Sequence, residues 1–348
     1  MVKRVNNLLA QITDRQNIRL AWLKAIKGKR KAADVLGFQN DFLTNIERVR
    51  ERLMSADPVW GKYRSFLVRD PKLRVINAAA LPERIMHHAI MNILEPVFER
   101  FQVFHSYACR KGKGTHAAVM HAFRQTKKFG FYLKLDVRKY FDSIDHRILL
   151  RQISRLIKDE QVLLLFHGII SSYSTGEGRG LPIGNLTSQY FANHYLAGLD
   201  HYILEKLAPG GYVRYMDDIV IWHSDFEKLK HLLEAVKAFC STELNIELKQ
   251  AVMGAVSEGV PFLGFMVRPS GIFLLGKSKR RMKKRAKAIA EDLAAGLIDD
   301  ERAALRATSI NAGVLIARSR AFRARLWKES GHGLEPCDTR RAGPEASS

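Results

Sequence analysis

Two runs of strand-forming residues flank Asp217 and Asp218 in the stretch GYVRYMDDIVIWHS, residues 211–224. Such runs predict a β-hairpin. The join contains neither glycine nor asparagine, the usual residues of a tight turn. Adjacent carboxylates repel each other, so an apolar ribbon with two of them at its tip costs free energy unless a cation neutralises them. The fold is therefore expected to bring a positive partner to this tip.

A hard divalent cation is the natural partner, because Mg²⁺ takes oxygen ligands from one or two carboxylates and from substrate phosphates. Asp-Asp pairs also occur in turns as solvated residues. A further carboxylate favours the metal interpretation: Asp136 ends the alternating apolar strand FYLKL. In-line phosphoryl transfer by two metals about 4 Å apart needs carboxylates from different strands, as Asp136 and Asp217 would supply if their strands are neighbours. Asp142 and Asp145, ahead of HRILLRQI, are expected in a turn or as a helix N-cap.

The charge balance indicates a polyanionic partner. The 348 residues contain 57 Lys and Arg against 35 Asp and Glu, a formal charge of +22. This excess favours nucleic acid, although anionic lipid or ribosomal partners would also attract a basic protein. The three cysteines are far apart and show no CxxC spacing, which argues against a disulfide framework and a zinc site. Without a signal peptide or a long apolar segment, the chain is expected to be soluble and cytoplasmic, with no membrane partner.

Periodicity and composition predict a mixed order of helices and strands. We expect two helices around a basic loop within 6–53 and a basic hairpin over 60–77. Helices are expected from Pro82 and over 161–173, 186–207 and 226–240, an extended segment over 245–249, and a hairpin in PFLGFMV and GIFLL. Composition changes at Gly276, where a basic helical lobe begins. The end of the chain, 331–348, lacks periodicity and is expected to be disordered.

Five motifs in one order complete the pattern: DVRKYFDSI, GLPIGNLTSQ, YMDD, the lysine of LNIELK, and FLGF. Their order and spacing resemble the successive motifs of reverse transcriptases, from about Arg74 to Phe265. The resemblance implies an α+β right-hand polymerase, with fingers and palm built from an antiparallel sheet plus helices and with a C-terminal helical thumb. The expected domains are fingers and palm over 1–275, the thumb over 276–330, and the tail.

The resemblance also implies roles for individual residues. Asp136 and Asp217 correspond to the ligands of two Mg²⁺ ions, Asp218 to the third carboxylate, and the carbonyl of Val137 to a further ligand. One ion would activate the primer 3′-hydroxyl for attack on the α-phosphate, and the other would stabilise the leaving pyrophosphate. FLGF corresponds to the primer grip, Phe262, Leu263, Gly264 and Phe265, although by itself it is typical of a core strand.

Four side chains are expected at the incoming deoxynucleoside triphosphate. Phe141, five residues after Asp136, corresponds to an aromatic gate that excludes a 2′-hydroxyl; a core phenylalanine is the alternative. Lys249 matches the lysine that neutralises or protonates the leaving phosphate. Arg74 and Arg110 are the expected triphosphate contacts, since guanidinium groups match phosphate oxygens, with a general template track as the alternative.

The loop LPIGNLTSQ departs from many relatives, which have glutamine and proline where this chain has Ile183 and Gln189. This pairing resembles the reverse transcriptases of diversity-generating retroelements, which copy a template RNA with errors at adenines. Ile183 and Gly184 are expected beside the nucleotide. The implied partners are template RNA, the RNA/DNA hybrid and a small basic accessory protein.

Two alternatives remain open at this point. A retron, group II intron or defence-associated reverse transcriptase would share the chemistry and differ in its biology. A non-catalytic RNA-binding scaffold with the same fold would also use the positive charge. The retained aspartates argue against a scaffold, which has no reason to bear their repulsion.

Overall fold

The computed structural model describes residues 4–55, 58–69 and 73–329, so the tail predicted to be disordered lies outside the described residues. The N-terminal segment forms four helices where two were expected: α1 (Leu9–Ile12), α2 (Arg15–Ala25), α3 (Ala33–Asn40) and α4 (Phe42–Met54). Only Asp41, at φ −132° and ψ 57°, separates α3 from α4. The predicted basic loop lies between α2 and α3.

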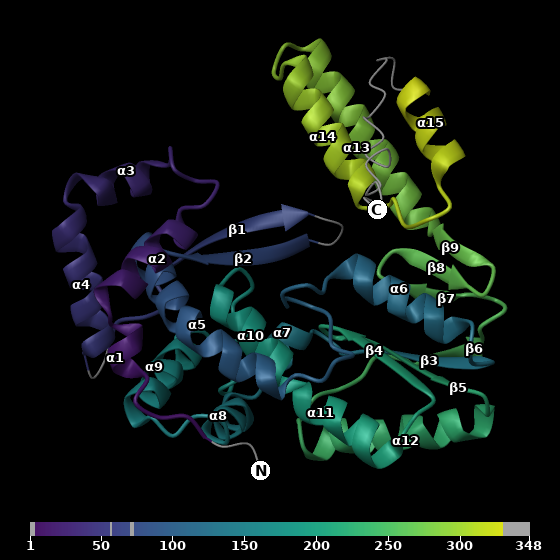
Figure 1. Cartoon of the computed structure of the whole chain (residues 1–348), viewed down its shortest axis with the longest axis horizontal. Helices are drawn as coiled ribbons and strands as arrows, with labels where there is room; N and C mark the ends of the chain where they lie inside the picture. The colour runs from purple at the N-terminus through teal and green to yellow at the C-terminus, as the bar shows by residue number, and fades with distance from the viewer. Residues whose placement is uncertain (1–3, 56–57, 70–72, 330–348) are drawn as a thin grey trace, which may run out of the picture.

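The predicted basic hairpin is confirmed as β1 (Tyr63–Arg69) and β2 (Leu73–Ala79), which pair antiparallel along their full length. It extends from the N-terminal helices toward the space below the C-terminal helices (Figure 1). Helix α5 (Leu81–Phe101) follows directly, with Pro82 in its first turn as predicted. Proline is favoured there because its missing N–H has no helical partner in any case.

A four-stranded antiparallel sheet forms the centre of the molecule. Its order is β4-β5-β3-β6, so β3 and β5 are the inner pair. The strands are β3 (Phe131–Asp136), β4 (Gly211–Tyr215), β5 (Asp218–His223) and β6 (Val252–Ala255). The first three were expected, β3 from its alternation and β4 and β5 from their runs of strand-forming residues, whereas β6, a short edge strand in the sequence VMGA, was not.

Alternation along β3 and β5 divides the sheet residues between two cores. Leu133 and Ile221 belong to one cluster, which includes residues of α12 (Phe226–Thr242). Tyr132 and Trp222 belong to the other, with residues of α6 (Thr115–Thr126). Each face of the sheet is thus covered by a helix, and the second face is also continuous with the C-terminal lobe.

Most of the remaining helices lie between the sheet and the N-terminal helices, whereas α11 (Ala197–His201) lies beside α12 (Figure 1). Asp145 caps the helix that begins at His146, and its side chain accepts from the backbone N–H groups of Arg147 and Ile148, as predicted. The helix expected over 186–207 is present but broken at Leu196, and it ends in a π-helical turn. These elements are α7 (Tyr140–Ser143), α8 (His146–Ser154), α9 (Glu160–Ser171), α10 (Leu186–Tyr195), α11 (Ala197–His201) and η1 (Tyr202–Leu207).

The C-terminal part consists of a small sheet and three helices. Strands β7 (Val260–Phe262), β8 (Phe265–Arg268) and β9 (Gly271–Leu274) form a three-stranded meander rather than a single hairpin. The helices α13 (Gly276–Ala294), α14 (Asp300–Ala312) and α15 (Arg320–Glu329) follow. They rise above the central sheet, separated from the N-terminal helices (Figure 1). Among the described residues, no helix combines the length and apolar character needed to cross a membrane.

Candidate active site

The three aspartates lie at one end of the inner strand pair. Asp136 is directly opposite Asp218 in the β3–β5 register, and Asp217 is in the turn that precedes β5. Because side chains alternate across a strand, Asp136 and Asp218 lie on the same face of the sheet as Lys134 and Trp222. The structure therefore makes the strands of Asp136 and Asp217 neighbours, as the metal interpretation requires.

Burial and mutual repulsion disfavour the charged forms of two of these carboxyls. Burial, and then the Asp136 carboxylate, raise the pKa of Asp217 above its ordinary value. Burial raises the pKa of Asp218 to about 6, although the Lys134 ammonium opposes this shift. A nearby cation would offset both costs.

Lysines contact two of the three carboxylates. Lys249 Nζ lies 2.5 Å from Asp136 Oδ1, in a pair whose side chains are 42% and 39% exposed. Lys134 Nζ lies 2.8 Å from Asp218 Oδ1 and is largely buried. The described residues contain no group of three His, Cys, Asp or Glu side chains arranged to hold a metal ion. The carboxylates meet as predicted by the sequence, but their oxygens contact ammonium groups.

The donor set nevertheless fits a divalent ion. Carboxylate oxygens are hard ligands, and the half-exposed Lys249 can swing away from Asp136 at little cost because a solvent-exposed ion pair contributes little. The segment after β3 adds a backbone ligand candidate. The Lys249 N–H donates to the Asp136 carbonyl, and the Arg138 N–H donates to the Glu247 carbonyl. These two bonds flank an antiparallel bridge between Val137 and Leu248. Strand alternation turns the Val137 carbonyl to the opposite side, toward β5.

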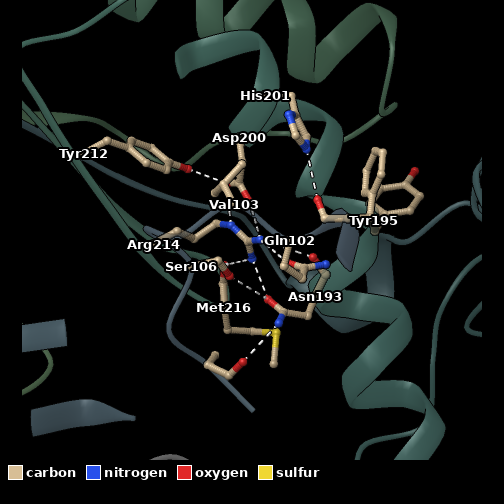
Figure 2. Close-up of polar contacts among 12 residues, drawn as sticks. Gln102, Val103, Ser106, Asn193, Tyr195, Asp200, His201, Tyr212, Arg214 and Met216 are labelled. Carbon is tan, nitrogen blue, oxygen red and sulfur yellow. Dashed lines mark hydrogen bonds and ion pairs between the residues drawn. The ribbon is translucent and has the colours of Figure 1, made fainter. Parts of the chain in front are cut away.

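A buried arginine holds the turn that carries Asp217 (Figure 2). Met216 has φ +56°, a left-handed conformation that is strained for a residue with a side chain. Arg214 Nη1 donates to the Met216 carbonyl at 3.1 Å. The same guanidinium pairs with Asp200 at 2.5 Å, and both side chains are fully buried. Burial alone would lower the pKa of Arg214, but the Asp200 carboxylate raises it above its ordinary value.

The network around Arg214 joins several elements (Figure 2). Asn193 on α10 accepts from Arg214 through its side chain at 2.8 Å and through its carbonyl at 3.2 Å. The Tyr212 hydroxyl donates to Asp200 at 2.5 Å, and Gln102 after α5 accepts from Arg214 at 3.3 Å. The geometry of the strained turn is thus fixed by side chains from α10, α11, β4 and the segment that follows α5. Neither Arg214 nor Asp200 was predicted from the sequence.

A cavity of about 1090 Å³ lies beside the carboxylates. Lys249, which contacts Asp136, is in its lining, and so are Arg74 from β2 and Ile183 from the loop before α10. Positive groups predominate in the lining: Arg74, Arg138, Lys139, Arg179, Lys237 and Lys249, against Asp142 and Glu247. A cavity with this charge suits a polyphosphate.

The loop LPIGNLTSQ is hydrogen-bonded to the hairpin beside this cavity. The Ile183 carbonyl accepts from the Asn77 N–H of β2 at 2.8 Å. Gly184 has φ +124°, and a Cβ there would lie 2.8 Å from Ile76 Cγ2, so the close approach of loop and hairpin requires glycine. Gly184 is exposed and does not line the cavity.

Phe141 and Tyr140 differ in burial. Tyr140 is 4% exposed, and its hydroxyl donates to the Ala192 carbonyl. Phe141 is partly buried, and its neighbours Asp142 and Ser143 line the cavity. Of the two rings, Phe141 is the more exposed, although it is not itself part of the lining. Its role as a sugar gate stays a prediction.

Arg110 is not placed as expected. Its guanidinium bonds to the Glu99 carboxylate at 2.6–2.9 Å and to the carbonyls of Val103 and Ser106. The side chain is only 8% exposed, and it does not line the cavity. With its donors committed inside the protein, Arg110 stabilises the segment between α5 and α6 rather than reaching a triphosphate.

The FLGF sequence forms the turn between β7 and β8. Phe262 and Phe265 are buried, whereas Leu263 and Gly264 form the turn itself, with φ of +48° and +88°. The Gly264 carbonyl accepts from Ser278 Oγ at 2.6 Å, which attaches the turn to α13. Contact with a primer stays a prediction, and only the two turn residues have the exposure for it.

Comparison with known proteins decides the family. Residues 68–267 match the family model described as "Reverse transcriptase (RNA-dependent DNA polymerase)". The chain belongs to the reverse transcriptase family. The α+β right-hand polymerase fold expected from the sequence is thereby confirmed. Reverse transcriptases generally depend on divalent metal ions.

This reverse transcriptase has relatives among bacterial and intron-encoded proteins. It is 25% identical to Protein YkfC of Escherichia coli over 243 residues, 56% of this chain and 62% of YkfC. It is 22% identical to the group II intron-encoded protein LtrA of Lactococcus lactis over 188 residues, 51% of this chain and 31% of LtrA. The matches therefore span less than two thirds of either relative. A solved telomerase structure from Candida albicans aligns with a TM-score of 0.49 at 10% identity, over 72% of this chain and 55% of the telomerase.

Proposed function

We propose that this chain is an RNA-directed DNA polymerase that copies template RNA into cDNA by Mg²⁺-dependent phosphoryl transfer in the cytoplasm. The observation that supports it most is the placement of Asp136 opposite Asp218, beside Asp217, next to a basic cavity that contains Lys249. Two bound Mg²⁺ ions would activate the primer 3′-hydroxyl and stabilise the leaving pyrophosphate. Asp136, Asp217, Asp218 and the Val137 carbonyl are the residues that would hold them.

The protein groups around the cavity supply binding and orientation. Arg74 on the hairpin and Lys249 beside Asp136 both line the cavity, where they would contact phosphate oxygens. A triphosphate would draw Lys249 away from Asp136, because several phosphate oxygens offer more negative charge than one half-exposed carboxylate. Lys249 would then neutralise the leaving phosphate while Asp136 becomes free to bind metal.

Template RNA and the RNA/DNA hybrid are held largely through phosphates in this proposal. The formal charge of +22 supports it, as does α13, whose sequence has eight basic residues between Lys277 and Lys287. Affinity for RNA should fall steeply as salt concentration rises, since each phosphate contact releases counterions. A small basic accessory protein from the same genetic element completes the proposed complex.

We further propose that synthesis is error-prone at template adenines and serves to diversify a target gene. The support is the loop LPIGNLTSQ, with Ile183 in the lining of the cavity. Glutamine at this place could hydrogen-bond near the incoming nucleotide, whereas isoleucine offers only shape. A mismatched nucleotide then loses less binding free energy relative to a matched one.

Primer extension tests the proposal. The purified protein is supplied with RNA template, DNA primer, deoxynucleotides and Mg²⁺, and the products are sequenced. Full-length cDNA with errors concentrated opposite adenine is expected. RNA binding without primer extension would instead support a non-catalytic scaffold. Extension with errors spread equally over all four template bases would contradict the diversifying role.

A group II intron function is the second candidate, because LtrA and other intron-encoded proteins are among the relatives. The surroundings of the gene separate the two. A near-repeat pair that differs at adenines favours diversification, whereas a self-splicing intron around the gene favours the intron function.

Replacing Ile183 by glutamine should lower misincorporation opposite template adenine about fivefold, the effect of one hydrogen bond of about 1 kcal/mol. The measurement is the error rate at adenine against the rate at other bases. Leu164→Gln, on the exposed surface of α9, is the matched control and should leave the error rate unchanged. Equal fidelity in Ile183→Gln and the starting protein would show that Ile183 does not determine the error rate at adenine.

Replacing Phe141 by valine should raise ribonucleotide incorporation roughly 10- to 100-fold, because a smaller side chain leaves room for the 2′-hydroxyl. The ratio of kcat/KM for ribo- and deoxynucleotides measures this. Tyr140→Phe removes only a hydroxyl bonded to backbone and should not alter the ratio. If Tyr140→Phe changed the ratio and Phe141→Val did not, the assignment of the gate to Phe141 would be wrong.

A further inference from the structure

Lys134 occupies a place between the carboxylates and the C-terminal sheet. It lies two residues before Asp136 on β3, so its side chain is on the same face of the sheet. Its ammonium donates to Asp218 Oδ2 at 3.0 Å and lies 2.8 Å from Oδ1. It also donates to the Pro261 carbonyl on β7 at 2.8 Å. One side chain therefore joins β3, β5 and β7.

This lysine is anchored in a way that Lys249 is not. A lysine ammonium has three N–H donors, and two carboxylate oxygens and a carbonyl lie within 3.0 Å of Lys134 Nζ. Its side chain is 19% exposed and Asp218 is 21% exposed. Lys249 contacts a single carboxylate oxygen at a half-exposed site. Substrate phosphates can attract Lys249, whereas moving Lys134 would leave buried polar groups without partners.

Pro261 leads directly into the Leu263–Gly264 turn. Phe262 and Phe265, on either side of the turn, are buried and pair across β7 and β8. From the other side, Ser278 Oγ and the Leu275 N–H donate to the Gly264 carbonyl. The turn is thus fixed to α13 at one end and, through Lys134 and Pro261, to Asp218 at the other.

We propose that Lys134 is a positioning residue that sets the distance between the carboxylates and the Leu263–Gly264 turn, and so places the primer end for attack. The inference rests on the proposed polymerase function and on the primer contact expected of that turn. In-line transfer tolerates little error, since a displacement of about 1 Å can cost roughly 100-fold in rate. Asp136 and Asp218 are fixed to each other by the β3–β5 register. Among the described contacts, the Lys134 ammonium bonds to both Asp218 and β7.

The test compares Lys134→Met, which keeps the length of the side chain without its donors, with Lys134→Arg, which keeps a cation. Lys230→Met removes a surface lysine paired with Glu227 on α12 and serves as the control. Each protein is assayed for thermal unfolding, for primer–template affinity in EDTA, and for the rate and KM of single-nucleotide incorporation. Amide hydrogen exchange of the segment 260–265 is followed without metal or nucleotide.

Lys134→Met should incorporate nucleotides roughly 100-fold more slowly, with primer–template affinity and nucleotide KM within about twofold of the starting protein. Amides of 260–265 should exchange faster, whereas those of α12 should not. Lys134→Arg should incorporate nucleotides at no less than a tenth of the starting protein's rate. Lys230→Met should match the starting protein.

Unchanged rate and unchanged exchange in Lys134→Met would overturn the proposal. A loss of rate matched by an equal loss of primer–template affinity, with no recovery in Lys134→Arg, would overturn it as well. If the starting protein itself extends no primer, the polymerase proposal fails. The exchange data would still show whether Lys134 ties Asp218 to the turn.

Discussion

Replacing Asp217 by asparagine should lower the rate of DNA synthesis by roughly 1,000-fold or more, about 4 kcal/mol of transition-state stabilisation. Asp217 lies in the turn before β5, where Asp136 and Asp218 meet in register. Asparagine keeps the shape of the side chain and removes the charge that a divalent ion would require. Asp136→Asn should have a similar effect. The measurement is single-nucleotide incorporation on a primed RNA template at saturating Mg²⁺.

The stability of the Asp217→Asn protein should rise, although its rate of synthesis falls. Burial and Asp136 raise the pKa of Asp217 in the folded protein. A carboxyl whose pKa is raised by folding lowers stability at pH values above its folded pKa, so removing the charge should raise the unfolding midpoint at pH 7. Asp300→Asn, an exposed aspartate in the first turn of α14, is the control for both assays. Full synthesis by Asp217→Asn would contradict the assignment of this site.

Replacing Arg214 by methionine should lower the free energy of unfolding by about 3–5 kcal/mol, because the Asp200 carboxylate would remain buried without its cation. Both side chains are fully buried in the present structure. Urea unfolding followed by circular dichroism measures the effect. Arg15→Met, which removes an exposed arginine paired with Glu47, should leave the midpoint unchanged.

A double replacement separates stability from the placement of the turn. Arg214→Met with Asp200→Leu removes the whole buried pair and should recover part of the lost stability. It should not recover synthesis, because the Met216 carbonyl still lacks the donor that holds its strained turn. Recovery of synthesis together with stability would show that Arg214 contributes to folding alone.

Local patterns predicted the elements that depend on local rules. The alternation of β3, the strand-forming runs of β4 and β5 and the N-cap of α8 were all readable, because each depends on residues within one short segment. The break between α3 and α4 was not. Val35, Phe38, Phe42 and Ile46 keep a helical spacing across Asp41, so the buried stripe continues although the backbone does not. Asp14, which caps α2, was a usable signal that periodicity obscured.

Some residues of the site could likewise be predicted from the sequence, and others could not. Asp136, Asp217 and Asp218 stand out because carboxylates are unusual at the ends of apolar strands. Lys134, Arg138 and Arg179 do not stand out among 57 basic residues, since only the folded chain shows what each one contacts. Arg110 illustrates the reverse error. Its guanidinium suggested a phosphate contact, but in the folded chain it pairs with Glu99, eleven residues earlier.

The apolar cluster on the second face of the central sheet bears on how the protein can be divided. It runs without a break from Trp222 in β5 through Phe262 to Met282 and Ile289 in α13. A chain cut at residue 275 would therefore leave part of this interior open to water. Such a fragment should aggregate instead of folding as an independent unit, so the C-terminal helices complete the palm as well as forming a lobe of their own.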